Sequence, residues 1–337
     1  MPDCRFLVVL IVALAGSSQG FAQEYSTSIV GTDFDLITDD DPTCFQSLTF
    51  DRLEKRAEMP DKTRKGLFRP AYQFLSTYSD GTRVHVFVDA RFGSETAART
   101  EAMRYVGRLG KLPTVLRGGV ERLVVHQSTE KTTAFSDRGL IVVYSANATQ
   151  RILDKDLEET LFHESVHAAW DIRHAQSDAW KRAQRADGTF ATAYAKRQPA
   201  REDLAESALF AFAVIHHPHR LPSRDLSRIK RLIPNRILFV ETLIPAGRPL
   251  IYKADPMEFC DVDLSRTGTA RDVIANVLSQ HYQLSDRQIA DCLENLGEEL
   301  ILAAARRLKI NEKEFRNNVE EMKHVNCDHA KTSTGRK

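Results

Sequence analysis

The sequence predicts an α+β fold, and three observations lead to that prediction. Segments typical of β-strands come first, at 83–88, 121–126 and 139–144. Amphipathic helix patterns follow them, above all at 154–172 and from about 199 to 216. The composition supplies the third observation, because 337 residues that are 42% hydrophobic and 28% charged can build a sizeable core. This composition excludes intrinsic disorder, a coiled-coil rod and a polytopic membrane protein.

The chain begins with a pattern typical of a cleavable export signal. An arginine precedes the apolar run Phe6–Gly16, and the small residues Gly20 and Ala22 fit a signal-peptidase site. We therefore expect residues 1–22 to be removed and the protein to be secreted or periplasmic. The run is shorter than the roughly 20 apolar residues of a membrane span, and no later stretch reaches that length. We expect no membrane insertion once the signal has been removed.

The cysteine content predicts the redox state of the thiols, and the net charge narrows the classes of binding partner. Removal of the signal leaves an even number of cysteines in an oxidising compartment, which predicts two disulfides among Cys44, Cys260, Cys292 and Cys327. Three pairings are possible, and buried free thiols are the alternative. Lys plus Arg number 47 and Asp plus Glu 46, so the formal charge of +1 gives no overall field for a nucleic-acid backbone. We expect no nucleic-acid partner.

The segment 23–80 contains no motif, and its role stays open between a propeptide, an accessory domain and an extra layer of the sheet. From residue 81 the patterns become clear. A strand is predicted at 83–88, an amphipathic helix at 94–109, and further strands at 121–126 and 139–144.

A helix is then predicted from about residue 156. Asp156-Leu-Glu-Glu159 fits a capping box, and the negative charges suit a helix N-terminus. An apolar stripe at steps of three and four residues is expected to face the core, and it comprises Leu157, Leu161, Ser165, Ala168 and Ile172.

This helix contains His163-Glu164-Ser-Val-His167, the strongest functional signal in the chain. Four residues make about one helical turn, so both imidazoles leave the same face, with Glu164 beside them. Two such imidazoles next to a carboxylate predict a zinc site with a general base. The alternative is a pair of ordinary histidines satisfied by hydrogen bonds.

A catalytic zinc site needs a third protein ligand and keeps one position open for water. Arg201-Glu-Asp-Leu-Ala-Glu206 places Glu202 and Glu206 one turn apart on a second predicted helix. One of them could ligate zinc while the other orients a ligating imidazole. The alternative is an acidic first turn favoured by the helix dipole. His174 is rejected as a ligand, because the zincin branch with a nearby third histidine needs glycine and histidine where this chain has Trp170 and Arg173.

Together these two motifs resemble those of gluzincin metallopeptidases, most nearly the catalytic domain of the anthrax lethal-factor type. The resemblance covers roughly 81–245. It implies a zincin-like domain with a small mixed sheet, an HExxH helix and a second helix that bears glutamate. It further implies that Glu202 ligates Zn²⁺, that Tyr194 assists catalysis and that the substrate is a polypeptide. The chain departs from the family pattern at Val166 and Asp203, which leaves the subfamily open but the ligands unchanged.

The predicted activity is zinc-dependent peptide hydrolysis with His163, His167 and Glu202 as ligands, Glu164 as general base and Tyr194 as oxyanion donor. Three histidines just beyond the second helix are reserve candidates for the donor role, namely His216, His217 and His219. Two alternatives stay open. One is a secreted binding protein on a zincin scaffold without turnover, and the other is zinc hydrolysis of a non-peptide amide or ester.

Two features toward the end of the chain lie outside these motifs. A basic run between 216 and 236 could favour acidic residues in a substrate, although such runs more often form a solvated helix face. Residues 246–337 are predicted to be a helical C-terminal region, with a loose tail after 330.

Overall fold

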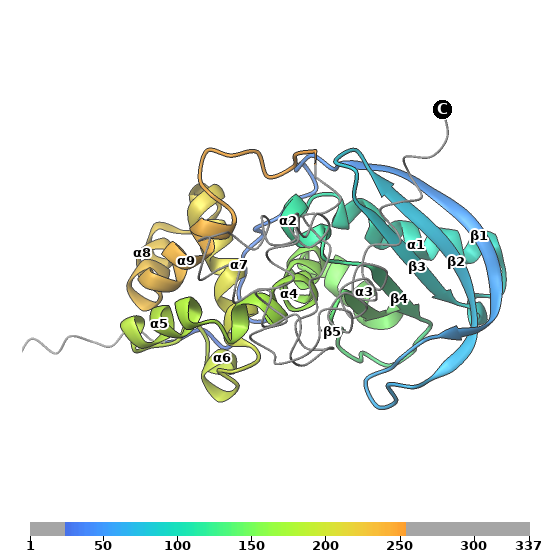
Figure 1. Ribbon diagram of the computed structural model, residues 1–337, viewed down its shortest axis with the longest axis horizontal. Helices are drawn as coiled ribbons and strands as arrows, with labels where there is room; N and C mark the ends of the chain where they lie inside the picture. The colour runs from blue at the N-terminus through green and yellow to red at the C-terminus, as the bar shows by residue number, and fades with distance from the viewer. Residues whose placement is uncertain (1–23, 254–337) are drawn as a thin grey trace, which may run out of the picture.

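The computed structural model describes residues 24–253, in which a mixed six-stranded sheet packs beside a group of helices (Figure 1). The strand order is β1-β2-β3-β4-β6-β5. The strands are β1 (Phe45–Glu58), β2 (Phe68–Tyr78), β3 (Arg83–Asp89), β4 (Arg122–His126), β5 (Phe135–Asp137) and β6 (Leu140–Tyr144). β3, β4 and β6 run parallel, while β1, β2 and β5 pair antiparallel with their neighbours. The predicted α+β class is therefore confirmed.

The helices lie mostly on the side of the molecule away from β1 and β2 (Figure 1). α4 lies between the sheet and the group formed by α5 to α9. The helices are α1 (Glu95–Leu109), α2 (Thr114–Arg117), α3 (Ser145–Leu153), α4 (Leu157–Trp170), α5 (Asp178–Asp187), α6 (Ala193–Arg197), α7 (Asp203–His216), α8 (Ser223–Leu232) and α9 (Pro234–Leu243). Three short turns complete them: η1 (Ala90–Phe92), the π-helical η2 (Asp171–Ala175) and η3 (Pro218–Arg220).

The strands and the first long helix form where the hydrophobic pattern predicts them. Along β3 the valines at 84, 86 and 88 are fully buried, while Arg83 and His85 are exposed and Phe87 is half-buried. α1 begins after Ser94, whose side chain accepts a hydrogen bond from the Ala97 amide and so caps the helix. β4 and β6 lie within one residue of the predicted strands.

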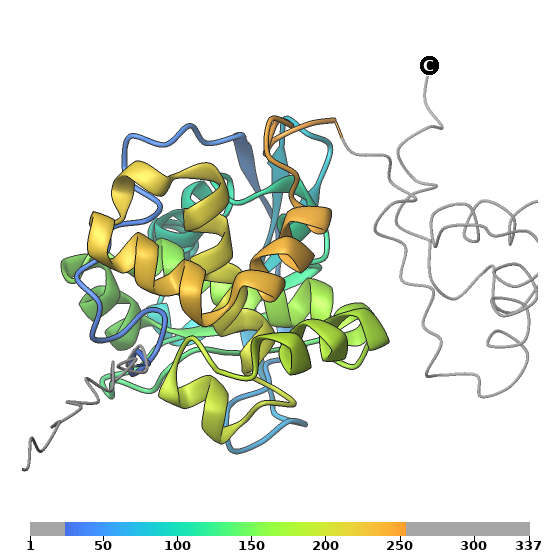
Figure 2. The ribbon, with the colours of Figure 1, turned by 90° about the vertical axis from the view of Figure 1, so that its left-hand side faces the viewer.

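The segment 24–80 is continuous with this architecture. β1 and β2 extend the sheet on the side of β3: β2 pairs with β3 through seven residue pairs, and β1 pairs with β2 through ten pairs that three register shifts interrupt. Residues 24–41 follow the helices instead, and Figure 2 shows this dark blue segment running along α7 and α8. Arg220 on η3 holds its end by a two-pronged ion pair with Asp41, at 2.6 Å for each oxygen.

Two local predictions about the helices are wrong. Asp156 stands at the N-cap of α4 but does not cap it, because its carboxylate accepts from Arg151 at 2.6 Å, and Glu159 accepts the Leu36 and Ile37 amides instead. Partners distant in sequence thus outcompete the local capping box. The second helix begins at Asp203, three or four residues later than predicted, because residues 198–202 form a turn after α6.

Several predictions concern residues outside the described range 24–253. The export signal, the helical region beyond 253 and Cys260, Cys292 and Cys327 all fall there. Cys44 is a buried free thiol in the structure, and burial raises its pKa to about 11. A free Cys44 fits the alternative of buried free thiols and does not fit two disulfides among the four cysteines. Among the described helices, none is long and apolar enough to cross a bilayer.

Candidate metal centre

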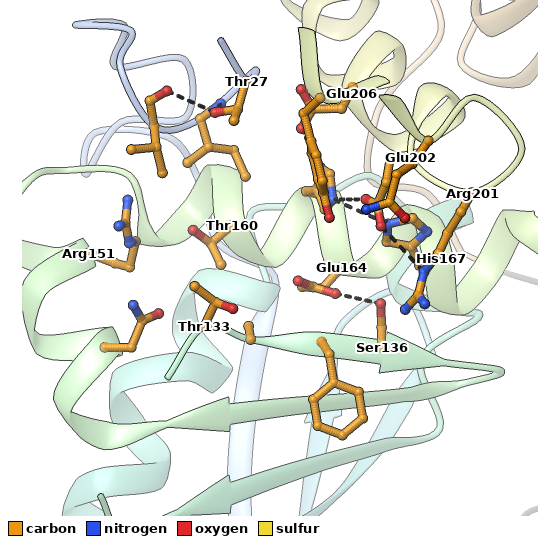
Figure 3. Close-up of a pocket in the computed structure, with 18 of the residues that line it drawn as sticks. Thr27, Thr133, Ser136, Arg151, Thr160, Glu164, His167, Arg201, Glu202 and Glu206 are labelled. Carbon is orange, nitrogen blue, oxygen red and sulfur yellow. Dashed lines mark hydrogen bonds and ion pairs between the residues drawn. The ribbon is translucent and has the colours of Figure 1, made fainter. Parts of the chain in front are cut away.

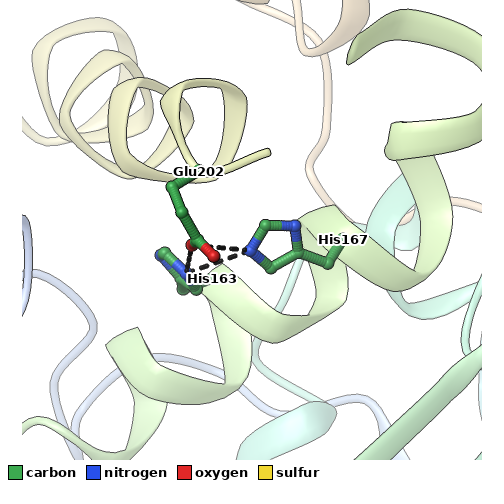
Figure 4. Close-up of side chains that lie close together, drawn as sticks. All are labelled: His163, His167 and Glu202. Atoms are coloured by element: carbon green, nitrogen blue, oxygen red, sulfur yellow. Dashed lines mark hydrogen bonds and ion pairs between the residues drawn. The ribbon is translucent and has the colours of Figure 1, made fainter. Parts of the chain in front are cut away.

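Three predicted site residues meet between α4 and the start of α7 (Figure 4). His163 and His167 leave one face of α4 a turn apart, and their Nε2 atoms lie 3.2 Å from each other. Oε2 of Glu202 lies 3.4 Å from Nε2 of His163 and 3.2 Å from Nε2 of His167. All three side chains are buried, and this group could bind a metal ion.

The group meets deep in the protein because α4 is covered on both faces. Leu157, Leu161 and Ala168 of the predicted stripe belong to the main core, and Ser165 is buried as well. Ile172, also predicted to face the core, is only half-buried, because α4 ends at Trp170 and Ile172 lies in η2. The opposite face, which bears the histidines, is covered by α7 rather than by solvent. Glu202 stands at the N-cap position of α7, so its side chain points back toward α4.

Carboxylates contact the outer nitrogen of each imidazole. Nδ1 of His167 lies 2.8 Å from Asp171 Oδ2, and Nδ1 of His163 lies 3.5 Å from Glu206 Oε1. Glu206 lies at ion-pair distance from His163 Nδ1, which makes no hydrogen bond. At His167 the hydrogen-bonded Asp171 carboxylate favours hydrogen on Nδ1, so a neutral imidazole directs its Nε2 lone pair at the point shared with Glu202. This is the arrangement by which metal-ligating histidines are oriented.

Charge is concentrated in this buried group. Burial opposes protonation of His167, but hydrogen bonds with Asp171 and Glu202 raise its pKa to about 10. Burial likewise opposes ionisation of Glu202, yet the two imidazoles hold its pKa well below the usual range. The carboxylates around the histidines thus favour a positive charge at their centre.

Glu164, the predicted base, lies in the same pocket but points toward the sheet (Figure 3). Its Oε2 accepts a hydrogen bond of 2.5 Å from the Ser136 hydroxyl on β5. Both side chains are buried, at 8% and 7% exposure. One carboxylate oxygen of Glu164 is therefore held by the edge strand of the sheet.

Tyr194 also reaches this pocket, from the short helix α6. Burial, together with the charge of Glu202 and a hydrogen bond to it, raises the Tyr194 pKa to about 12. The hydroxyl is therefore protonated at neutral pH and lies beside a predicted metal ligand. The structure thus brings Tyr194 to the pocket that holds His163, His167, Glu202, Glu164 and Glu206.

The pocket has a volume of about 440 Å³ and extends beyond the metal group. Figure 3 shows its two ends: His167, Glu202 and Arg201 lie at one, and Arg151 lies at the other with Thr160 between them. Three residues of the N-terminal segment, Thr27, Ile29 and Val30, line another part of the wall. A cavity of this volume fits a small ligand or a few residues of a peptide.

The reserve histidines are not part of this pocket. His216 Nε2 lies 3.0 Å from the Ile244 carbonyl oxygen, and His217 packs on Phe212, where burial lowers its pKa to about 4. Nor is the basic run a free surface throughout. Arg220 pairs with Asp41, and the buried Arg236 pairs with Asp187 and Asp203.

Sequence reasoning missed two side chains that complete the site. Asp171 could have been found, because it lies four residues after His167 and so continues the same helical face. Ser136 carried no such signal, since nothing in its neighbourhood relates it to a helix that begins 21 residues later.

Comparisons of the chain with protein-family models, with curated proteins and with solved structures found no match. Because fold class by itself does not imply function, the functional argument has to come from the geometry of the site.

Proposed function

We propose that this protein is an exported zinc metallopeptidase. In this proposal His163, His167 and Glu202 hold zinc, and Glu164 is the general base. The observation that carries it is the convergence of two imidazole nitrogens and one carboxylate oxygen within 4.8 Å, beside a second buried glutamate in one pocket.

The donor set fits zinc in type and spacing. Zinc takes histidine nitrogen and carboxylate oxygen at about 2.0–2.2 Å, and two ligands of a tetrahedral site then lie roughly 3.3 Å apart. The three donor atoms here are separated by 3.2–3.4 Å. Three protein ligands leave one position of a tetrahedron open, which is typical of a catalytic site.

Zinc bound there supplies a Lewis acid that polarises a substrate carbonyl and makes a water molecule more acidic. The protein's own residues do the rest. Glu164 takes the proton of the attacking water and returns it to the leaving amine. Because Ser136 holds Oε2, the other oxygen of Glu164 is the one that takes the proton.

Tyr194 is the proposed donor to the oxygen that becomes negative during attack. Its hydroxyl is protonated and lies beside Glu202, next to the place where the carbonyl must bind. The Tyr194 side chain is half-buried in the pocket wall, so its hydroxyl needs little reorganisation to donate.

A polypeptide substrate is supported by the sheet edge beside the pocket. β5 ends the strand order, and Phe135 and Ser136 of β5 line the pocket. An extended peptide can add to such an edge by main-chain hydrogen bonds. The α4 helix beside the mixed sheet and a following glutamate-bearing helix also support a zincin-like catalytic domain over 81–245, whose sheet β1 and β2 extend from before residue 81.

The test combines metal analysis with digestion of an unfolded protein. We expect one zinc ion per purified chain and cleavage of the unfolded substrate. Glu164→Gln should retain zinc and lose about 10²–10⁴-fold in rate. Glu121→Gln is the matched control, because Glu121 is exposed and lies outside this pocket.

Each contrary result points elsewhere. Zinc binding without cleavage of any polypeptide would favour a binding protein, and cleavage of small amides or esters alone would favour a non-peptide hydrolase. Full activity of Glu164→Gln would remove the assigned base.

The third ligand has its own test in two glutamates one turn apart. Glu202→Ala should abolish tight zinc binding, whereas Glu206→Ala should weaken it about ten- to a hundredfold, because Glu206 contacts the outer side of His163. The reverse ranking would exchange their roles.

A further inference from the structure

Residues 24–31, which we call the N-terminal strap, are tied to the segment that carries Tyr194. The backbone amide of Tyr25 donates to the Ala191 carbonyl at 3.0 Å, and the Tyr25 carbonyl accepts from the Ala193 amide at 2.7 Å. The Tyr194 amide then donates to the carbonyl of Ser26 at 3.1 Å. The strap therefore fixes the start of α6 by a short run of main-chain hydrogen bonds.

Tyr25 anchors the strap on the outside of α7 and α8. Its side chain is buried, and its ring lies 5.0 Å from the Phe210 ring and beneath the Arg228 guanidinium at 3.8 Å. Its hydroxyl donates to Asp225 at 2.6 Å. These contacts combine an apolar body with a satisfied polar end, so they hold the strap at a defined place.

Beyond this anchor the strap reaches the metal centre through one amide. The Ser28 N–H donates to Glu206 Oε2 at 2.7 Å, a buried hydrogen bond to a carboxylate. The other oxygen of Glu206, Oε1, lies 3.5 Å from His163 Nδ1, which is an ion-pair distance and not a hydrogen bond. The Ser28 hydroxyl has no hydrogen-bond partner, so the amide is the group that contacts Glu206.

We propose that the N-terminal strap is a positioning segment of the metal centre, in which the Ser28 amide holds Glu206 against His163 and thereby raises metal affinity. The proposal rests on the proposed function for the presence of a metal at His163. It adds that a segment more than 130 residues before the HExxH motif takes part in metal binding. Thr27, Ile29 and Val30 of the strap also line the pocket wall.

The test compares two substitutions at position 28 in the purified protein. Ser28→Pro removes the amide hydrogen, and we expect zinc affinity, measured by competition with a chelator, to fall about tenfold. Ser28→Ala keeps the amide and loses a hydroxyl that has no partner, so its zinc affinity should stay within about twofold of the wild type.

A double-mutant cycle separates positioning through Glu206 from general damage. Glu206→Ala combined with Ser28→Pro should bind zinc no more than about twofold more weakly than Glu206→Ala alone. A structural effect of proline that did not act through Glu206 would instead lower affinity in both backgrounds.

Wild-type affinity in Ser28→Pro, or equal losses with and without Glu206, would overturn the proposal. If circular dichroism finds Ser28→Pro unfolded, Tyr25→Ala decides, since it releases the anchor far from the metal. Tyr25→Ala should weaken zinc binding several-fold, and an unchanged affinity would overturn the proposal.

The wild type is measured first: if it binds no zinc, the proposed function fails and this proposal with it. If the wild type binds zinc and cleaves the substrate, and Ser28→Pro binds zinc equally well, only the proposal for the N-terminal strap is refuted and the proposed function stands.

Discussion

Two buried polar clusters of this protein, the Asp80–Arg117 ion pair and the metal centre, differ in whether their charged and hydrogen-bonding groups find all their partners within the cluster. Asp80 and Arg117, both fully buried, form an ion pair between the sheet and α2. Arg117 also donates to the Leu109 and Leu112 carbonyls, and Asp80 also accepts from Thr82 and from Thr114. Every charge in this cluster has a partner of opposite sign, and its donors and acceptors are matched.

The metal centre, by contrast, brings together groups that can all act as acceptors. Nε2 of His163, Nε2 of His167 and Oε2 of Glu202 converge on one point, and each offers a lone pair there when the imidazoles are neutral. The outer nitrogen of His167 is hydrogen-bonded to Asp171, and that of His163 lies at ion-pair distance from Glu206. The comparison teaches that burial alone does not mark a functional cluster. What marks it is a set of buried acceptors that a cation completes.

The largest expected effect is a loss of stability at the Asp80–Arg117 cluster. Arg117→Met leaves Asp80 buried without its positive partner, so we expect the free energy of unfolding to fall by about 3–5 kcal/mol. Urea unfolding of the metal-free protein measures it. Arg122→Met, at an exposed pair with Glu58, is the control and should cost less than about 1 kcal/mol. Similar losses of stability in Arg117→Met and Arg122→Met would show that burial does not make the Asp80–Arg117 pair more important than an exposed pair.

The metal centre should respond in affinity rather than in stability. Asp171→Asn weakens the acceptor at His167 Nδ1, so zinc affinity should fall about ten- to a hundredfold. Unfolding of the metal-free protein should change by less than about 1 kcal/mol, because Asp171 is 29% exposed at its side chain. Chelator competition and urea unfolding test the two halves, with the exposed Asp178→Asn as control. A large stability loss with intact affinity would assign Asp171 to the scaffold.

Glu159 is only partly satisfied, unlike the Asp80–Arg117 cluster, in which all groups have partners. One of its oxygens accepts two amides, whereas the other is buried without a partner, and burial raises its pKa to about 8. The folded protein therefore keeps a proton that the unfolded chain releases above about pH 4.5, so stability falls as pH rises from 5 to 8. Glu159→Gln cannot ionise, and we expect it to remove about 1–3 kcal/mol of that fall. Parallel stability curves for variant and wild type, from urea unfolding across this range, would contradict this.

The smallest expected effect concerns the hydroxyl that holds the base. Ser136→Ala should lower kcat about two- to tenfold with zinc content unchanged, because one hydrogen bond to Glu164 is lost. Ser136→Thr keeps the hydroxyl and should restore most of kcat. Steady-state kinetics on the unfolded substrate measures both, and a change confined to KM would point to substrate binding at β5 instead.

Local pattern predicted much of the fold and failed where distant groups compete. Strands β3, β4 and β6 and the helix α1 follow from alternation and amphipathicity, which act between neighbours in sequence. The capping box at Asp156 failed because Arg151 and the amides of residues 36 and 37 took its two carboxylates. No periodicity in the chain describes such partners.

The sequence by itself determined that His163 and His167 share one face with Glu164 beside them, because four residues of a helix make one turn whatever surrounds it. It also nominated Glu202, although spacing alone could not decide whether that carboxylate reached the histidines. Only the tertiary structure decided this, together with the places of Ser136 and Ser28. Their contacts join segments up to 178 residues apart, and the packing of α7 and the strap against α4 determines which side chains meet.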